Sequence, residues 1–291
     1  MKPAPFKYIA ARSLDEALAL KAEYGDEGRF LAGGQSLVPT LNFRLAQPAL
    51  VIDINPLAQY AGVAAQGETI RIGALTRYRD LERHPGLAGS LPLIAEALPH
   101  IAHPQIRNRG TIGGNLAHAD PASELPAIVL ALAGRLRAQS QRGERWIAAA
   151  EFFTGALTTA LESDEMLSEV ELPVAPPRSG ACFMEVARRR GDFALAGVAC
   201  TVRLDADGRC AEARIALCNA GDTPILADEA GRSLAGEPIN VAAIEQAADL
   251  VQGAIDPGGN VHASAEFQRH LAGVLTRRAL TTANDRARRE H

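Results

Sequence analysis

The chain reads Ala32-Gly33-Gly34-Gln35-Ser36 at one position and Thr111-Ile112-Gly113-Gly114-Asn115 about eighty residues later. We call these runs the first and the second glycine stretch. Glycine lets a backbone approach a ligand closely, and the polar residues that end each stretch can donate hydrogen bonds. Two such turns brought together would surround a diphosphate with backbone N–H groups. A single glycine pair more often marks a tight turn between a strand and a loop, but two with polar exits favour a ligand.

Two common phosphate-binding motifs are absent from the sequence. The dinucleotide fingerprint G-x-G-x-x-G does not occur, so a Rossmann fold is not supported. No glycine is followed by Lys-Ser or Lys-Thr, so there is no P-loop. The sequence therefore predicts a dinucleotide held by some other architecture.

The composition is that of an ordinary globular protein. The chain has 291 residues, of which 47% are hydrophobic, and a formal net charge of −4. This charge argues against nucleic acid as the main partner, because no basic surplus is available to neutralise phosphates. No run approaches the roughly 18 apolar residues of a membrane span, and no signal peptide is evident. We expect a cytoplasmic protein without a transmembrane segment.

The cysteines and histidines do not indicate a metal site. Cys182, Cys200, Cys210 and Cys218 form no C-x-x-C pair, and we expect them to be reduced and packed. An iron–sulfur cluster usually needs four thiolates, so this chain is not expected to hold one. His100 and His103 form an H-x-x-H pair, but no third ligand accompanies it.

The apolar patterns predict an α+β protein. Ser13 and Glu16 form a capping box before a helix that stops at Gly25. Expected strands lie at 29–32, 49–54, 69–73, 145–148 and 169–174, with a helix at 91–100. Three further strands at 181–186, 198–204 and 213–217 precede helices at 241–251 and 263–279. The predicted units are an N-terminal α/β subdomain (1–55), a second α+β subdomain (56–176), a C-terminal domain (177–285) and a disordered tail (286–291).

Three ordered motifs resemble a known family. They are the first glycine stretch continued by Leu37, Pro39 and Arg44, the run from Arg107 to Asn115 followed by Pro121-Ala122-Ser123-Glu124-Leu125-Pro126, and Arg188-Arg189-Arg190-Gly191-Asp192-Phe193-Ala194. Together they resemble the FAD-binding medium subunit of molybdenum hydroxylases, which include carbon monoxide dehydrogenase and the xanthine dehydrogenase family. The resemblance spans residues 5–280. It implies a two-part, non-Rossmann FAD-binding domain of the vanillyl-alcohol-oxidase or PCMH type, followed by a C-terminal antiparallel sheet with helices.

The resemblance also implies which residues bind FAD. The diphosphate and ribityl region would be held by Ala32, Gly33, Gly34, Gln35, Ser36 and Leu37 together with Thr111, Ile112, Gly113, Gly114 and Asn115.

Five further residues complete the implied site. Glu124 replaces an aspartate that commonly binds the adenosine ribose, which keeps the carboxylate but lengthens the side chain. Leu167 would provide an apolar backbone contact at the adenine end, and Phe193 would stack over the isoalloxazine. Arg188 would contact either the cofactor or a neighbouring subunit. His118 precedes Asp120 by two residues and could be read as a catalytic base, but the family makes it a binding-loop residue. No residue of this chain is expected to be catalytic.

The resemblance implies an electron-transfer role. Electrons would come from 2Fe-2S clusters in a small partner subunit, after a large molybdopterin subunit has oxidised the substrate. FAD in this chain would pass them to an external acceptor, which could be NAD, a quinone, a carrier protein or oxygen. The expected assembly is a dimer of heterotrimers. Two alternatives stay open at this point: a self-sufficient flavoprotein oxidase or reductase of the same fold, and a non-enzymatic phosphate- or nucleotide-binding module.

Overall fold

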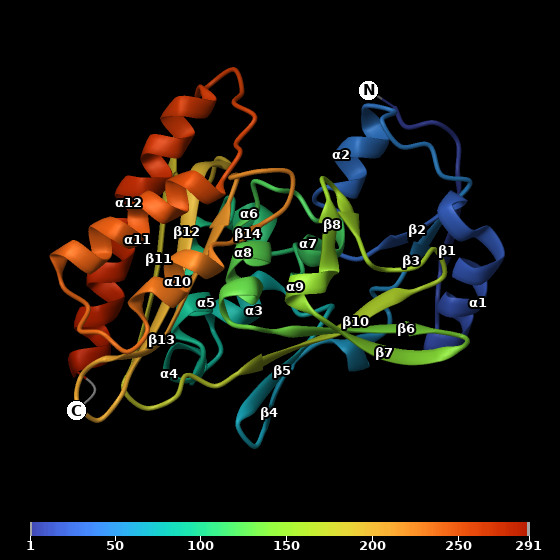
Figure 1. Cartoon of the computed structure of the whole chain (residues 1–291). Coiled ribbons are helices and arrows are strands. Elements are labelled where there is room, and N and C mark those ends of the chain that lie inside the picture. The colour runs from blue at the N-terminus through green and yellow to red at the C-terminus, as the bar shows by residue number, and fades with distance from the viewer. Residues whose placement is uncertain (1, 290–291) are drawn as a thin grey trace.

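The computed structural model describes residues 2–289. A small N-terminal sheet lies at one end of the molecule, a larger sheet with its helices lies in the middle, and a third sheet with a layer of helices lies at the other end (Figure 1). None of the helices in residues 2–289 combines the length and apolar character needed to cross a lipid bilayer.

The N-terminal sheet is parallel, with β3 between its two neighbours in the order β1-β3-β2. Its strands are β1 (Lys7–Ala10), β2 (Gly28–Leu31) and β3 (Leu50–Asp53). Helix α1 (Leu14–Tyr24) begins where expected, because the Ser13 hydroxyl accepts a hydrogen bond of 3.1 Å from the N–H of Glu16. The Glu16 carboxylate accepts a second bond of 2.8 Å from the N–H of Arg12. Gly25 ends the helix, as predicted, with a positive φ of 49° that favours glycine.

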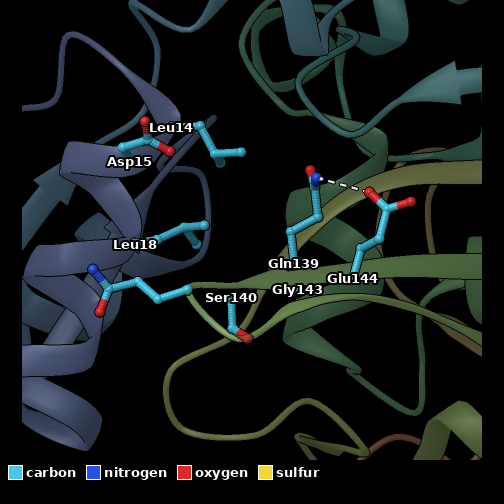
Figure 2. A pocket seen from close by; sticks show the side chains of 8 residues that line it. Leu14, Asp15, Leu18, Gln139, Ser140, Gly143 and Glu144 are labelled. Atoms are coloured by element: carbon cyan, nitrogen blue, oxygen red, sulfur yellow. Dashed lines mark hydrogen bonds between the residues drawn. The ribbon is translucent and has the colours of Figure 1, made fainter.

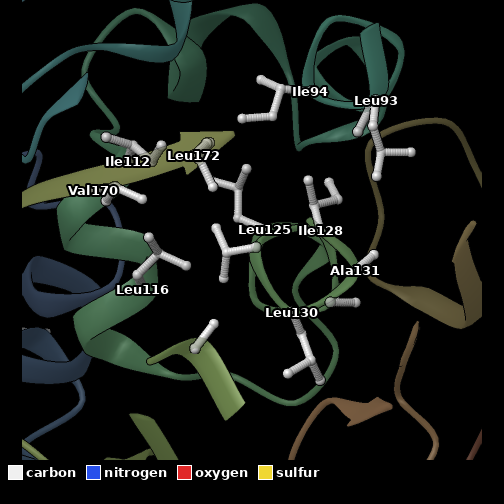
Figure 3. Packing of buried hydrophobic residues seen from close by; sticks show 14 of the residues in the cluster. Leu93, Ile94, Ile112, Leu116, Leu125, Ile128, Leu130, Ala131, Val170 and Leu172 are labelled. Atoms are coloured by element: carbon white, nitrogen blue, oxygen red, sulfur yellow. The ribbon is translucent and has the colours of Figure 1, made fainter. Parts of the chain in front are cut away.

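The central sheet is antiparallel in the order β4-β5-β10-β6-β7. Its strands are β4 (Val63–Gln66), β5 (Thr69–Gly73), β10 (Met166–Pro173), β6 (Arg135–Ser140) and β7 (Gly143–Ala148). One face packs against helices, among them α5 (Pro92–Ala97), α7 (Ile112–His118) and α8 (Glu124–Ala131). Figure 3 shows Leu116 and Leu125 of these helices gathered beside Val170 and Leu172 of β10.

The opposite face of the central sheet is charged. The Arg71 and Arg135 guanidiniums lie 5.3 and 4.6 Å from the ring centre of Trp146, and both donate to the Glu171 carboxylate. This alternation of apolar and polar faces is what period-2 strands produce when one face is buried.

The third sheet is antiparallel in the order β11-β12-β13-β14 and is covered by three helices. These elements are β11 (Ser179–Ala187), β12 (Ala194–Leu204), β13 (Cys210–Cys218), β14 (Ile225–Leu226), α10 (Asp228–Leu234), α11 (Val241–Ala254) and α12 (Ala265–Arg289). All four cysteines are free and buried in this sheet, as expected from the sequence. The other face of the sheet contacts α5 and α8 and so joins the central part of the molecule.

The predicted disordered tail is wrong for residues 286–289, because α12 continues to Arg289. Arg286 forms an ion pair with Glu96 and donates to the carbonyl of Ala181, and Ala287 is buried. A basic run at the end of a chain usually indicates a frayed terminus, but here Arg286 contacts two segments that are distant in the sequence. Residues 290 and 291 lie outside the described residues.

Short elements connect the three sheets. They are α2 (Leu37–Asn42), α3 (Tyr78–Glu82), α4 (Leu87–Ser90), α6 (Pro104–Arg107), α9 (Ala149–Phe152), β8 (Phe153–Gly155), β9 (Thr158–Thr159) and the 3-10 turns η1 (Gly25–Glu27), η2 (Ala58–Tyr60) and η3 (Leu98–His100). Helix α2 follows the first glycine stretch and α7 contains most of the second, so the candidate site lies between the N-terminal sheet and the central helices.

Candidate functional site

The two glycine stretches lie side by side in the fold. A Cβ atom placed on Gly33 would lie 2.5 Å from the carbonyl oxygen of Arg109 and 2.8 Å from the Cα of Gly110. Real Cβ atoms essentially never come this close to a backbone, so only glycine fits at position 33. The backbone of the first stretch is therefore in direct contact with the two residues that immediately precede the second stretch, which is the closeness the diphosphate hypothesis requires.

The first glycine stretch keeps its hydrogen-bond donors available. Gly34 has φ +73°, a left-handed conformation that turns the chain from β2 towards α2. Within residues 2–289, the N–H groups of Gly34, Gln35 and Ser36 donate to no protein acceptor. The Gln35 amide donates to the Gly33 carbonyl at 3.0 Å, and the Ser36 hydroxyl makes no capping bond to α2. The stretch therefore presents backbone donors and a hydroxyl without internal acceptors.

The second glycine stretch is not the open turn that the sequence suggested. It forms the first turn of α7, and Thr111 is the N-cap residue, whose hydroxyl accepts from the N–H of Gly114 at 3.0 Å. The N–H of Gly113 donates to the Ala74 carbonyl at 2.9 Å, and that of Asn115 donates to the Thr111 carbonyl at 3.1 Å. Free backbone donors are therefore not found at Gly113, Gly114 and Asn115, because the Ala74 carbonyl, the N-cap hydroxyl and the helix backbone already accept from them.

The two glycines of the second stretch have different reasons to be glycine. Gly113 is buried, and a Cβ there would lie 2.7 Å from the Ala74 carbonyl oxygen at the end of β5. Gly114 is exposed, and a Cβ there would meet the Thr111 hydroxyl at 2.7 Å and Ala32 of the first stretch at 3.8 Å. Gly113 is thus required by internal packing, whereas Gly114 faces the junction between the stretches.

Three other predicted residues lie at the edges of this region. The Asn115 amide and the Ser123 hydroxyl are hydrogen-bonded to each other, with distances of 2.7 and 2.9 Å, and this pair ties α7 to the start of α8. His118 is the last residue of α7 and is half-buried. Leu167 lies opposite Ala138 in the central sheet and is only 6% exposed.

Glu124 is buried rather than open to a ligand. It begins α8 and is 4% exposed, and burial raises its pKa to about 7, with the negative charge of Glu185 adding to the effect. His100 opposes this shift and lies 3.2 Å from Glu185, measured from Nδ1 to Oε1. The hydrogen bond to Glu185 raises the pKa of His100. The charged neighbours of the Glu124 carboxyl group are thus protein residues, Glu185 and His100 among them. Ribose binding by Glu124 stays a prediction.

The loop between β11 and β12 exposes Phe193. The ring is 65% exposed, and the loop rests on the central part of the chain because Gly191 packs against His103 and Ala102. Gly191 has φ +89°, and a Cβ there would lie 2.8 Å from the Ala102 carbonyl oxygen. The loop is thus held against a segment from the central part of the chain, with its aromatic residue at the surface.

Arg188 begins this loop and contacts groups of its own chain. Its guanidinium lies 3.4 Å from the Asp192 carboxylate and 3.4 Å from Nδ1 of His262, and it is exposed. The choice between cofactor and subunit contact therefore stays open for Arg188.

Sequence reasoning missed two polar residues at the junction. Asn55 lies two residues beyond the end of β3 and donates its side-chain N–H to the Ala32 carbonyl at 2.9 Å. Arg77 donates to the Asn55 side-chain oxygen and to the Arg109 carbonyl. The available signal was the position of Asn55 at the carboxyl end of a buried parallel strand, where ligand sites of α/β sheets gather.

A separate cleft of about 350 Å³ lies between α1 and the β6–β7 hairpin (Figure 2). It is lined by Leu14, Asp15, Leu18, Gln139, Ser140, Gln141, Gly143 and Glu144. None of these lining residues is basic and two are acidic, so the cleft does not suit a diphosphate. The glycine junction remains the candidate site.

Comparison with known proteins identifies the family. The sequence model described as "FAD binding domain in molybdopterin dehydrogenase" matches residues 4–175, and that of the "CO dehydrogenase flavoprotein C-terminal domain" matches residues 181–283. The chain belongs to the family of FAD-binding flavoproteins of molybdopterin dehydrogenases that these two models describe, and it is a subunit of an oxidoreductase. The resemblance drawn from the motifs is confirmed, together with the α+β, non-Rossmann FAD-binding fold. The non-enzymatic binding module is thereby disfavoured.

The chain is similar over its full length to subunits of several dehydrogenases. It is 43% identical to the 6-hydroxypseudooxynicotine dehydrogenase complex subunit alpha of Paenarthrobacter nicotinovorans, over 99% of this chain and 97% of the relative. It is 42% identical to the caffeine dehydrogenase subunit beta of a Pseudomonas species, over 98% and 97%. Its structure matches a chain of carbon monoxide dehydrogenase from Hydrogenophaga pseudoflava with a TM-score of 0.96, 37% identity and coverage of 98% and 99%.

Proposed function

We propose that this chain binds FAD at the junction of its two glycine stretches and relays electrons within a molybdenum-containing dehydrogenase. The observation that carries the proposal is the contact of Gly33 with the backbone of Arg109 and Gly110, beside N–H donors that have no acceptor among residues 2–289. A diphosphate needs close backbone approach, free N–H donors and positive potential. The junction offers all three, since Arg77 and Arg109 lie beside it.

The residues divide the work of holding the cofactor. Gly34, Gln35 and Ser36 would donate to the diphosphate, and exposed Gly114 would let it approach the start of α7. FAD, when bound, supplies the ability to take up electrons singly and release them in pairs. Phe193 would cover part of the flavin ring and limit the access of water to it. None of these residues has an acid–base or nucleophilic role in this proposal.

The electron donors would lie in partner subunits. Burial raises the pKa of Cys182 and of Cys210 to about 11, and the four cysteines lie inside the third sheet. Such thiols are poor metal ligands, since a cluster needs accessible thiolates. We therefore propose a small 2Fe-2S subunit and a large molybdopterin subunit as partners, in a dimer of heterotrimers located in the cytoplasm. The names of the relatives, a complex subunit alpha and a subunit beta, support a multi-subunit assembly.

The proposed division into units places boundaries at residues 55 and 176. The gap between the two matching family models, at residues 176–180, supports the second boundary. The N-terminal unit would contribute the first glycine stretch and the second unit the other one. The site would thus form only when the two units pack together.

A visible spectrum of the purified full chain tests FAD binding. We expect flavin bands near about 370 and 450 nm and release of FAD, rather than FMN, on denaturation. Absence of both would contradict the proposal. Purification from the native source tests the relay: iron and molybdenum subunits should accompany the chain. A chain that oxidises a substrate alone would instead favour a self-sufficient oxidase or reductase.

A further inference from the structure

Asn55 holds the start of the first glycine stretch. Its side-chain N–H donates to the Ala32 carbonyl at 2.9 Å and approaches the Leu31 carbonyl at 3.3 Å. Asp53 fixes the orientation of this amide, because its Oδ1 accepts from the Asn55 backbone N–H at 2.9 Å and from the side-chain N–H at 2.6 Å. With its N–H groups engaged in this way, Asn55 presents its side-chain oxygen away from the stretch.

Arg77 is anchored on the second glycine stretch. Its backbone forms a β-bridge with Thr111, and the neighbouring N–H of Tyr78 donates to the Gly110 carbonyl at 3.1 Å. The Arg77 guanidinium donates from one nitrogen to the Arg109 carbonyl. The same guanidinium donates from its other terminal nitrogen to the side-chain oxygen of Asn55.

The side-chain hydrogen bonds of these two residues link the first stretch to Arg109, two residues before the second stretch. The backbone bridge between Arg77 and Thr111 reaches the second stretch itself. Ala32 is held by Asn55, Asn55 by Arg77, and Arg77 holds Arg109. Asp53 ties this series of hydrogen bonds to the N-terminal sheet, since its Oδ2 accepts from the Tyr8 hydroxyl of β1 at 2.5 Å. The planar guanidinium is suited to this bridging position, because its donors point in fixed directions towards two acceptors.

We propose that Arg77 and Asn55 are positioning residues that clamp the two glycine stretches at the separation a diphosphate requires. This inference rests on the proposed FAD site. The contact between Gly33 and Arg109 sets how closely the stretches can approach, and the clamp keeps them from separating. The free donors of the first stretch then hold their direction before the ligand arrives, which lowers the entropic cost of binding.

The test measures FAD affinity of the full chain after removal of its flavin. Arg77→Gln and Asn55→Ala should each weaken FAD binding by about 10- to 100-fold, as expected for lost hydrogen bonds to a charged group. Because either change opens the same clamp, the double variant should bind FAD only slightly more weakly than the weaker-binding single variant does. Arg79→Gln, on the exposed side of helix α3, which begins directly after Arg77, is the matched control and should bind as the wild type does.

Two further measurements separate positioning from a general structural or charge effect. Arg77→Lys keeps the charge but loses the planar guanidinium that donates to two acceptors at once, so its FAD affinity should lie between those of Arg77→Gln and the wild type. In the residual complexes of Arg77→Gln, the phosphorus resonances of the diphosphate should shift. The melting temperature of the flavin-free chain should stay near the wild-type value, because the Arg77 backbone bridge remains.

Several results would overturn the clamp. They are wild-type affinity in Arg77→Gln, full recovery in Arg77→Lys, losses that add in the double variant, and a fall in flavin-free melting temperature that accounts for the weaker binding. The proposed function fails separately, if the wild-type chain itself binds no FAD. If Gly114→Val abolishes binding while Arg77→Gln binds FAD as tightly as the wild type, the FAD site stands and the clamp is excluded.

Discussion

Gly33 rests directly on the backbone of Arg109, with a hypothetical Cβ only 2.5 Å from that carbonyl oxygen. Because both partners at this contact are backbone, neither can move aside as a flexible side chain would. We expect Gly33→Ala to lower the free energy of unfolding by about 1–3 kcal/mol, the usual cost of overpacking. It should also weaken FAD binding, since the stretches are forced apart. Urea unfolding and flavin titration of the full chain measure the two effects.

A matched glycine gives the control for this change. Gly253 lies in α11 with no atom near its would-be Cβ, so Gly253→Ala should be neutral or stabilise the chain by up to about 1 kcal/mol. Equal destabilisation by both substitutions would show that the Gly33 contact has no special cost.

The neighbouring glycines of the second stretch should respond in opposite ways. Gly113→Ala should destabilise the fold, because the added methyl would meet the Ala74 backbone. Gly114→Val should leave a folded chain that no longer retains FAD, because the side chain points into the junction and displaces only the Thr111 hydroxyl. Circular dichroism and flavin content of the purified variants separate the outcomes. Normal flavin content in Gly114→Val would place the diphosphate elsewhere.

Stability should fall as the pH rises through the neutral range, because two groups bind protons more tightly in the folded state. The pKa of Glu124 is raised by burial from 4.5 to about 7, so its contribution decreases as pH rises from about 4.5 to 7. The pKa of His100 is raised by its bond to Glu185, so this contribution is complete below the unfolded value and disappears above the folded one. Both groups therefore lower the free energy of unfolding as the pH rises.

The size of the effect follows from the Glu124 shift, which corresponds to up to about 3 kcal/mol between acidic and neutral pH. Urea unfolding of the wild type and of Glu124→Gln, compared from pH 5 to pH 8, should show that the advantage of the wild type shrinks as the pH rises. The exposed Glu151→Gln serves as the control and should run parallel to the wild type. A constant difference between the wild type and Glu124→Gln would contradict the buried-carboxyl argument.

Local signals in the sequence were enough for much of the fold. The apolar run at 49–54 became β3, the alternation at 69–73 became β5, and the capping residues Ser13 and Gly25 bound α1 as expected. These features depend on residues close together in the chain, so periodicity and capping rules identify them. The meeting of the two glycine stretches was also anticipated, because their shared residue types suggested a common ligand.

The remaining features depend on contacts that no local pattern encodes. Thr111 looked like part of a turn, but its hydroxyl caps α7 and accepts from the Gly114 N–H, one of the donors assigned to a ligand. The burial of Glu124 depends on β11 and η3, which bring Glu185 and His100 to it from other parts of the chain. Arg77 and Asn55 lie 22 residues apart and meet only when the N-terminal sheet packs against the central helices.

Phe193 offers the most direct test of how the site treats the flavin ring. The side chain is 65% exposed at the end of a loop that Gly191 anchors against His103, so its removal should not disturb the fold. We expect Phe193→Ala to retain FAD with unchanged stoichiometry but to alter the flavin fluorescence and to change the rate of reoxidation by external acceptors, because the ring becomes more open to solvent. Phe267→Ala, another partly exposed phenylalanine, should leave both readouts unchanged. If fluorescence and acceptor kinetics are the same in Phe193→Ala and the wild type, the aromatic ring does not cover the flavin, and the loop must serve another surface of the assembly.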